Sequence, residues 1–97
     1  MPNIRFNYLY RDGGNYKIFG NIVFKNHLNL PLQYIQPQIV SNLIDETWFY
    51  AEKWKLPILY CNLSIDDPTW HEFESIEYTK AKGTTDISEF LQLFADA

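Results

Sequence analysis

The side chains that could perform catalysis are few, and they do not form a known catalytic pattern. The one cysteine, Cys61, and one of the two histidines, His71, could in principle form a nucleophile–base pair. Cys61, however, lies in an apolar run, residues 58–63, without the glycine turn or helix start that activates a thiol. We therefore expect Cys61 to pack as a small buried hydrophobic residue. No serine lies in a nucleophile elbow and no glycine-rich phosphate loop precedes a helix, so we expect no catalytic residues and favour a non-enzymatic protein.

A histidine with neighbouring carboxylates is the best candidate for a metal site. Imidazole and carboxylate groups suit Zn²⁺ or Mn²⁺, and the cluster comprises Asp66, Asp67, His71, Glu72 and Glu74. In an extended strand neighbouring side chains point to opposite faces, so His71 and Glu72 would not face the same ion. The spacing also matches neither an EF-hand loop nor a zinc-binding helix. We therefore predict no metal site and no cofactor, and a metal-assisted hydrolase ranks third among the candidate functions.

Aromatic residues point instead to a protein interface. The 97 residues include three Trp, seven Tyr and seven Phe, and three Trp are hard to bury completely in so small a domain. Trp and Tyr that remain at a surface are common anchors of protein interfaces. Together with nearby carboxylates they form our predicted partner-binding set: Trp48, Tyr50, Trp54, Trp70, Asp66, Asp67, Glu72 and Glu74. The leading hypothesis is a non-enzymatic interaction module, such as an inhibitor or accessory factor of a larger system.

Charge is divided unevenly along the chain. Residues 1–44 contain four basic residues and one acidic residue, a net charge of +3. Residues 45–97 contain four lysines and eleven acidic residues, a net charge of −7. The acidic half argues against general nucleic-acid binding there and is compatible with a basic protein partner.

Segment 4–24 predicts a β-hairpin, because apolar residues alternate on both sides of two adjacent glycines. Two-residue loops at Gly13-Gly14 or Asp12-Gly13 compete with a three-residue loop, Asp12-Gly13-Gly14. We prefer the last, with Gly14 in the left-handed region, because it places apolar side chains opposite one another. That register pairs Tyr10 with Tyr16, Tyr8 with Ile18, Phe6 with Gly20 and Ile4 with Ile22, and it assigns Ile4, Phe6, Tyr8, Tyr10, Tyr16, Ile18 and Ile22 to the core.

The opposite face of this hairpin carries three positive charges and no acidic residue. Antiparallel sheets commonly keep one solvated face, which is the simplest explanation. The alternative function is binding of a nucleic acid or nucleotide, with a ring for stacking and cations for phosphate. The residues that would form this anionic-ligand site are Arg5, Arg11, Lys17 and Phe19.

The middle of the chain predicts a helix over residues 31–43, with Leu32, Ile35, Ile39 and Leu43 on its buried stripe. Pro37 conflicts with a regular helix, since it lacks an N–H and clashes with the preceding turn. Either the helix is kinked at Pro37, or Pro37 starts it and residues 31–36 form a separate turn. Residues 45–56 fit a short strand at 48–50 and a helical turn equally well.

The last third predicts two strands and a helix. Residues 58–63 and 70–79 have strand composition, and residues 66–69 form a turn between them. Asp86 can cap a final helix, with Glu89 completing a capping box. Apolar residues then fall on one stripe at i, i+3, i+4 and i+7: Ile87, Phe90, Leu91 and Phe94.

Taken together, these elements predict one α+β domain, residues 1–97, with a small, mostly antiparallel sheet and two helices on one face. No apolar run has the length of a membrane span and the N-terminus does not resemble a signal peptide, so we expect a cytoplasmic protein without membrane contact. An edge strand could pair in a homodimer, and the sequence leaves that open.

Three spaced motifs carry a resemblance to a family of small bacterial proteins for which no activity is assigned. They are NYLYRDGGNYK (residues 7–17), FYA…WKLP (49–57) and TWHEFESIE (69–77). The resemblance covers nearly the whole chain and implies a bacterial origin, with a mobile genetic element as one option. It implies no catalytic residue, and Pro37 departs from the plainly helical segment that the resemblance leads us to expect.

Overall fold

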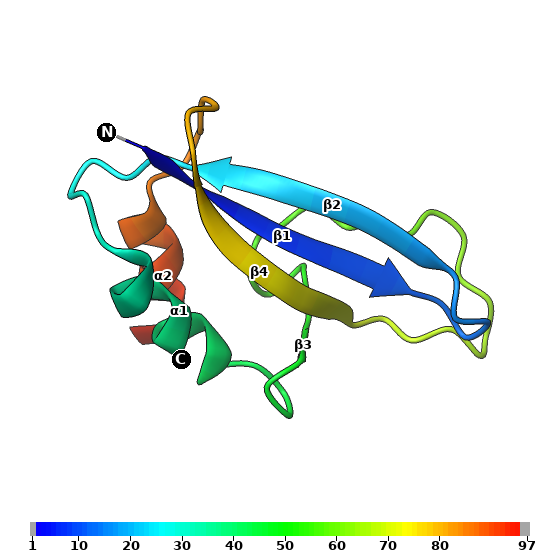
Figure 1. Cartoon of the computed structure of the whole chain (residues 1–97). Helices are drawn as coiled ribbons and strands as arrows, with labels where there is room; N and C mark the ends of the chain where they lie inside the picture. The colour runs from blue at the N-terminus through cyan, green and yellow to red at the C-terminus, as the bar shows by residue number, and fades with distance from the viewer. Residues whose placement is uncertain (1, 96–97) are drawn as a thin grey trace.

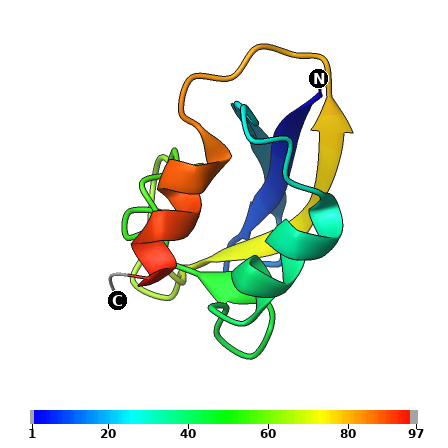
Figure 2. The same ribbon diagram turned by 90° about the vertical axis from the view of Figure 1, so that its left-hand side faces the viewer.

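A computed structural model describes residues 2–95, which form an α+β fold (Figure 1). The elements in chain order are β1 (Asn3–Arg11), β2 (Lys17–Phe24), α1 (Leu32–Val40), β3 (Trp48–Phe49), β4 (His71–Thr79) and α2 (Ile87–Ala95). The strands are antiparallel and form one curled sheet in the order β2-β1-β4-β3. Both helices cover its inner face, α1 on the β4 side and α2 on the β2 side (Figure 2). The predicted fold class and N-terminal hairpin are confirmed.

The core lies between the inner face of the sheet and the helices, with Phe6 of β1 at its centre. Phe6 is fully buried. Aromatic rings surround it at centroid distances of 5.2–6.4 Å: Tyr8, Phe49, Trp54, Phe73 and Phe90. Tilted and edge-to-face pairs of this kind contribute about 0.5–1.5 kcal/mol each beyond burial. The ring of Phe90 links α2 to this cluster and also contacts Phe24 of β2 at 4.7 Å, so the cluster fixes α2 against β1 and β2.

The predicted hairpin register is wrong by two residues. Tyr8, not Phe6, lies opposite Gly20, and Phe6 lies opposite Ile22. A shift of two keeps each residue on its predicted face, so the inner residues of β1 are buried as expected. Gly20 is needed because a Cβ there would lie 2.6 Å from a methyl carbon of Leu59, which occupies that part of the inner face.

Asp12 explains the difference in register. Its carboxylate accepts hydrogen bonds from the N–H groups of Gly14 and Tyr16, each at 2.9 Å. The loop is consequently Gly13-Gly14-Asn15, and Asn15 rather than Gly14 is left-handed, with φ of 68°. Tyr16 then flanks the loop at 71% exposure, so its predicted place in the core is also wrong.

The predicted strand over residues 58–63 does not form. This segment crosses the inner face of the sheet, held by the hydroxyl of Tyr8, which donates to the carbonyl of Pro57 at 2.6 Å, and by a hydrogen bond from the N–H of Leu59 to Nε2 of His71 at 3.1 Å. Burial raises the pKa of Tyr8 to about 12, so this donor keeps its proton at neutral pH. Cys61 follows the crossing and is exposed, so the expected buried thiol is also wrong.

Helix α1 begins at Leu32 and continues through Pro37. Pro37 is exposed, so the carbonyl that loses its helical partner is on the side where water can replace it. Burial of Ile35 and Ile39 on the opposite side stabilises the helix. The alternative prediction that the helix starts at Pro37 is therefore wrong.

Residues 45–56 turn out to be a two-residue strand followed by turns. Trp48 and Phe49 pair with Glu72 and His71 of β4, respectively. Beyond Tyr50 the chain forms consecutive turns, which bury Trp54.

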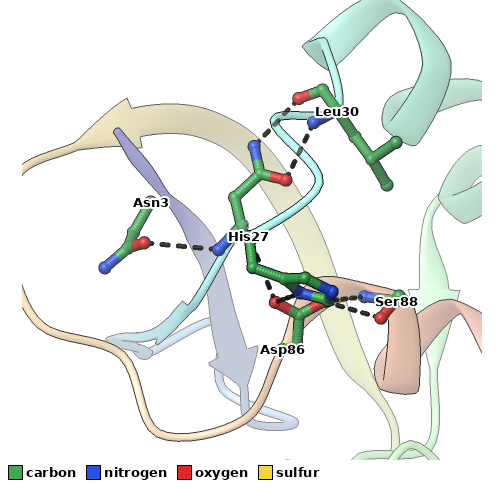
Figure 3. A network of polar contacts seen from close by, with 6 residues as sticks. Asn3, His27, Leu30, Asp86 and Ser88 are labelled. Carbon is green, nitrogen blue, oxygen red and sulfur yellow. Dashed lines mark hydrogen bonds and ion pairs between the residues drawn. The ribbon is translucent and has the colours of Figure 1, made fainter. Parts of the chain in front are cut away.

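The start of α2 is tied to the end of β2 by Asp86 (Figure 3). Its carboxylate accepts hydrogen bonds from the N–H of His27 at 3.1 Å, the N–H of Ser88 at 3.0 Å and the hydroxyl of Ser88 at 2.6 Å, and it pairs with Nδ1 of His27 at 2.7 Å. Burial alone would raise the pKa of Asp86, but these contacts outweigh it and hold the pKa well below its usual range. Asp86 caps the helix as predicted, although through Ser88 and not Glu89.

Candidate functional site

A hollow of about 690 Å³ lies at the end of the sheet where β1 finishes and β4 begins, on the right in Figure 1. Its walls come from the hairpin turn, from β3 and from the loop before β4. The lining residues are Arg11, Asp12, Gly13, Trp48, Asp66, Asp67, Pro68, Thr69, Trp70 and Glu72. The hollow thus brings together Trp48, Trp70, Asp66, Asp67 and Glu72 of the predicted partner-binding set.

Two tryptophans form the aromatic part of this hollow. Trp48 is half-buried and Trp70 is 41% exposed, and their ring centroids are 6.4 Å apart at an interplanar angle of 62°. Pairing of β3 with β4 positions Trp48 opposite Glu72. A tight turn between Ile44 and Trp48 also holds it, with reciprocal backbone hydrogen bonds of 2.8 and 3.0 Å. Backbone pairing therefore presents the ring of Trp48, while Trp70 is the last loop residue before β4.

Asp67 joins the two turns that wall the hollow. One carboxylate oxygen accepts the N–H of Gly13 at 2.8 Å, and the other accepts the N–H and hydroxyl of Ser64 at 2.9 and 3.1 Å. The hydrogen bonds from the backbone of Ser64 and then of Gly13 lower the pKa of Asp67, so it is ionised at neutral pH. The hydroxyl of Tyr10 holds the same loop from below, donating to the carbonyl of Pro68 at 2.7 Å.

Arg11 and Glu72 form an ion pair at the floor of the hollow. Nε of Arg11 lies 2.7 Å from one carboxylate oxygen of Glu72, and Nη2 lies 3.3 Å from the other. The hydrogen bond that Arg11 donates to Glu72 raises the pKa of Arg11. Against this one guanidinium the lining carries four carboxylates, so the hollow is net negative. Asp66 is exposed, and within residues 2–95 no hydrogen bond or ion pair engages its carboxylate.

Three members of the predicted set lie outside the hollow. Trp54 is a core residue, stacked on Phe49 at 4.6 Å with an interplanar angle of 20°. Tyr50 lies under the ammonium group of Lys53, 5.0 Å from its ring centroid. Glu74 is exposed on β4, away from the lining. Conversely, no pattern in the sequence predicts that the hairpin turn lies beside the loop at residues 66–69, because only the strand pairing of β1 with β4 brings them together.

The cations of the alternative anionic-ligand face are largely neutralised by β4. Arg11 pairs with Glu72, and Arg5 lies 3.8 Å from Glu77. Lys17 and Phe19 remain exposed at the β2 side, with Phe19 at 62%. This face therefore carries mixed charge once the third strand is in place, which favours phosphate binding less than the hairpin alone.

His71 lies on the inner face of the sheet, packed among core rings. It is fully buried, and tyrosine and phenylalanine rings surround it: Tyr8, Tyr10, Phe49 and Tyr60. Because Nε2 accepts a hydrogen bond, the neutral ring carries its proton on Nδ1, which has no hydrogen-bond partner. Burial lowers the pKa of His71, with the charge of Glu52 acting in the opposite direction.

Within residues 2–95, no group of three or more His, Cys, Asp or Glu residues is placed to hold a metal ion. None of the helices in this described part is long and apolar enough to cross a membrane. No protein-family model matches the chain, and neither a curated protein nor a solved structure matches it, so the motif resemblance remains a prediction.

Proposed function

We propose that this protein is a non-enzymatic interaction module that captures a Lys or Arg side chain of a basic partner protein in the hollow. The observation that carries this proposal is the pair of Trp rings, one from β3 and one from the residue before β4, on one wall of a net-negative hollow. Trp is the best aromatic partner for a cation, and such contacts are worth about 0.5–2 kcal/mol. A volume near 690 Å³ is ample for one long side chain with its flanking backbone.

The carboxylates divide into two roles in this proposal. Asp67 and Glu72 are held by hydrogen bonds from the protein itself and so shape the walls, while their charge still attracts a cation. No such hydrogen bond within residues 2–95 holds the carboxylate of Asp66, which is the direct partner of the bound ammonium or guanidinium group in this proposal. An arrangement whose polar groups are already fixed needs little reordering on binding.

Tryptophan fluorescence provides the test. We would titrate the protein with an acetylated pentapeptide containing two arginines and with its glutamate counterpart. Only the arginine peptide should change the emission, because the hollow is net negative. The change should come from Trp48 and Trp70, which line the hollow, and not from Trp54, which lies in the core. Trp70→Ala should weaken binding at least tenfold, as expected for the loss of an interface anchor, and Asp66→Asn about two- to fivefold, in the range of one exposed ion pair.

The chain offers matched controls for both substitutions. Phe19→Ala removes a ring that is 62% exposed, against 41% for Trp70, from β2 at the other edge of the sheet. Glu74→Gln removes an exposed carboxylate outside the hollow. Both should bind like the parent. Equal responses to the two peptides, or unchanged affinity in Trp70→Ala, would contradict the proposal.

A further inference from the structure

A second recognition surface is present at the free edge of β2. Hydrogen-bonded and non-bonded pairs alternate along two antiparallel strands. The N–H of Asp12 donates to the carbonyl of Tyr16, so by this alternation the even-numbered residues of β2 bond to β1. The odd-numbered residues Lys17, Phe19, Asn21 and Val23 therefore point their N–H and C=O groups outward. Lys25 fits the same pattern, since its N–H donates outward to Thr85 and its carbonyl accepts from Ile87.

One end of this edge is already covered. Residues 85–87 run parallel to β2 at Lys25, and Gly83 is so close that a Cβ there would lie 2.7 Å from the carbonyl oxygen of Val23. Over Lys17–Asn21, no hydrogen bond within residues 2–95 reaches the outward backbone groups. The exposed edge is therefore about five residues long, and the sheet itself shows at Lys25 that the edge accepts another strand.

A second hollow lies between the inner face of β2 and α2, beneath Ile22 and Phe24 at the end of the exposed edge. Its volume is about 310 Å³, and polar and apolar groups share its lining: Ile22, Phe24, Trp54, Lys55, Thr85, Glu89, Phe90 and Leu93. Figure 2 shows α2 on the β2 side of the sheet. An added strand that pairs along Lys17–Asn21 and extends one residue further would place a side chain opposite Ile22, on the same face as Ile22 and toward this hollow. The edge thus supplies backbone partners and the hollow supplies a side-chain pocket, the two parts of strand-addition recognition.

Charge identifies the kind of strand that fits. β2 carries Lys17, and the residue after it is Lys25, with no acidic residue between them; Lys55 adds a cation to the hollow against one carboxylate, Glu89. A second copy of the chain is the other candidate occupant: antiparallel pairing of two β2 strands over the exposed stretch, centred on Phe19, would place Lys17 opposite Asn21 of the other copy.

We propose that the β2 edge binds an extended acidic segment of another protein as an added strand, with one apolar side chain of that segment in the hollow between β2 and α2. The two hollows share no lining residue, and the exposed edge runs from Lys17, opposite Arg11 of the first hollow, toward the second. A partner could thus offer an acidic strand and a basic side chain to the two sites.

The probe is an acetylated, fluorescein-labelled heptapeptide that alternates Leu or Val with Asp and Glu, compared with the same peptide carrying Lys at the charged positions. The acidic peptide should raise the anisotropy on binding, and the lysine peptide should bind at least tenfold more weakly. Amide hydrogen exchange of Phe19 and Asn21 should slow when the acidic peptide binds, because their N–H groups would then donate to it.

Asn21→Pro tests the backbone contact. Proline is tolerated on an edge strand where the N–H faces solvent, so this variant should fold and lose at least tenfold in affinity. Lys17→Glu should weaken binding two- to fivefold, whereas the matched exposed Lys53→Glu and also Trp70→Ala should leave it unchanged. If Asn21→Pro does not fold, the exchange measurement on the parent protein still decides.

Three results would overturn the proposal: a flat anisotropy titration, peptide binding without slower exchange at Phe19 and Asn21, or a dimer in sedimentation equilibrium that protects these amides without peptide. The last result would assign the edge to a second copy. Trp70→Ala should affect binding of the arginine peptide and not of the acidic peptide. Failure of the strand-addition proposal would therefore not contradict the proposal for the cation-binding hollow.

Discussion

Two aspartates, Asp86 and Asp67, each link distant chain segments through carboxylate hydrogen bonds, at opposite ends of the molecule. The surroundings of the two links differ. Each carboxylate accepts a backbone N–H from a segment more than fifty residues away, His27 for Asp86 and Gly13 for Asp67, and each also binds a nearby serine. At the Asp86 end, the joined segments (Figure 3) lie next to core residues, with Phe24 shortly before His27 and Ile87 directly after Asp86. At the Asp67 end, the joined turns leave a hollow with exposed rings.

The two ends differ in the elements that cover the sheet next to each aspartate. α2 begins directly after Asp86 and places Phe90 and Leu91 on the sheet, so the core is completed there. No helix covers the Asp67 end, and the rings there are the Trp48 and Trp70 pair. Exposed aromatic groups are costly to keep unless they bind something. The comparison teaches that the helices stabilise one end of the sheet and leave exposed the other end, where we propose that a partner binds.

Truncating a ring at each end should separate stability from binding most clearly. Phe6→Ala removes the centre of the aromatic cluster and should lower the free energy of unfolding by about 3–5 kcal/mol. Trp70→Ala should lower it by less than about 1 kcal/mol, because surface positions contribute little. Urea titrations followed by far-UV circular dichroism measure both. Equal losses would mean that the exposed rings belong to the core after all.

Removing each aspartate sharpens the comparison. Asp86→Ala deletes a helix cap and hydrogen bonds to a buried charge, and we expect a loss of about 2 kcal/mol in the free energy of unfolding. Asp67→Ala should cost less stability but abolish binding of the arginine peptide, since the two turns lose their link. Ser88→Ala is the control that keeps the Asp86 carboxylate. A larger loss of stability from Asp67→Ala would reverse the assignment of the two ends.

The pattern of local residues was enough to predict the elements that carry one dominant signal. Alternation in 4–24, the cap at Asp86 and the apolar stripe of α2 all led to the observed elements. The prediction of the hairpin register was wrong because hydrogen bonds to the Asp12 carboxylate, and not a left-handed glycine, determine the loop. The alternation of apolar residues contains no information about such a hydrogen bond. The predicted strand at residues 58–63 was wrong for a related reason. An apolar segment that packs across the face of a sheet has the same composition as a strand within the sheet.

The candidate site was predicted in part. Trp48, Trp70 and the carboxylates were selected by residue type, and the structure groups most of them. Trp54 was selected on the same grounds and lies in the core, because burial depends on the turns after β3. The β2 edge could not be found from the sequence, since which strand lies at an edge depends on the order β2-β1-β4-β3.

His71 lies at the same end of the sheet as the hollow but on the inner face, and it offers the smallest predicted effect, a dependence of stability on pH. Burial lowers its pKa in the folded protein, so below pH ~6.5, the usual pKa of histidine, the unfolded chain binds the proton more readily. Stability should therefore be complete above that pH and fall as the pH drops through the interval down to the folded-state pKa. One proton limits the slope to about 1.4 kcal/mol per pH unit.

Urea midpoints between pH 5 and 8, for the parent and for His71→Gln, would isolate this contribution, because glutamine does not titrate and can still accept the N–H of Leu59. The parent should lose stability on the acid side, and the variant should be flatter there. Since Glu72 of the hollow follows His71 directly, protonation should loosen the recognition end before the core. Binding of the arginine peptide should then weaken at a higher pH than the one at which the far-UV signal is lost, and simultaneous loss would show that the two ends unfold as one unit.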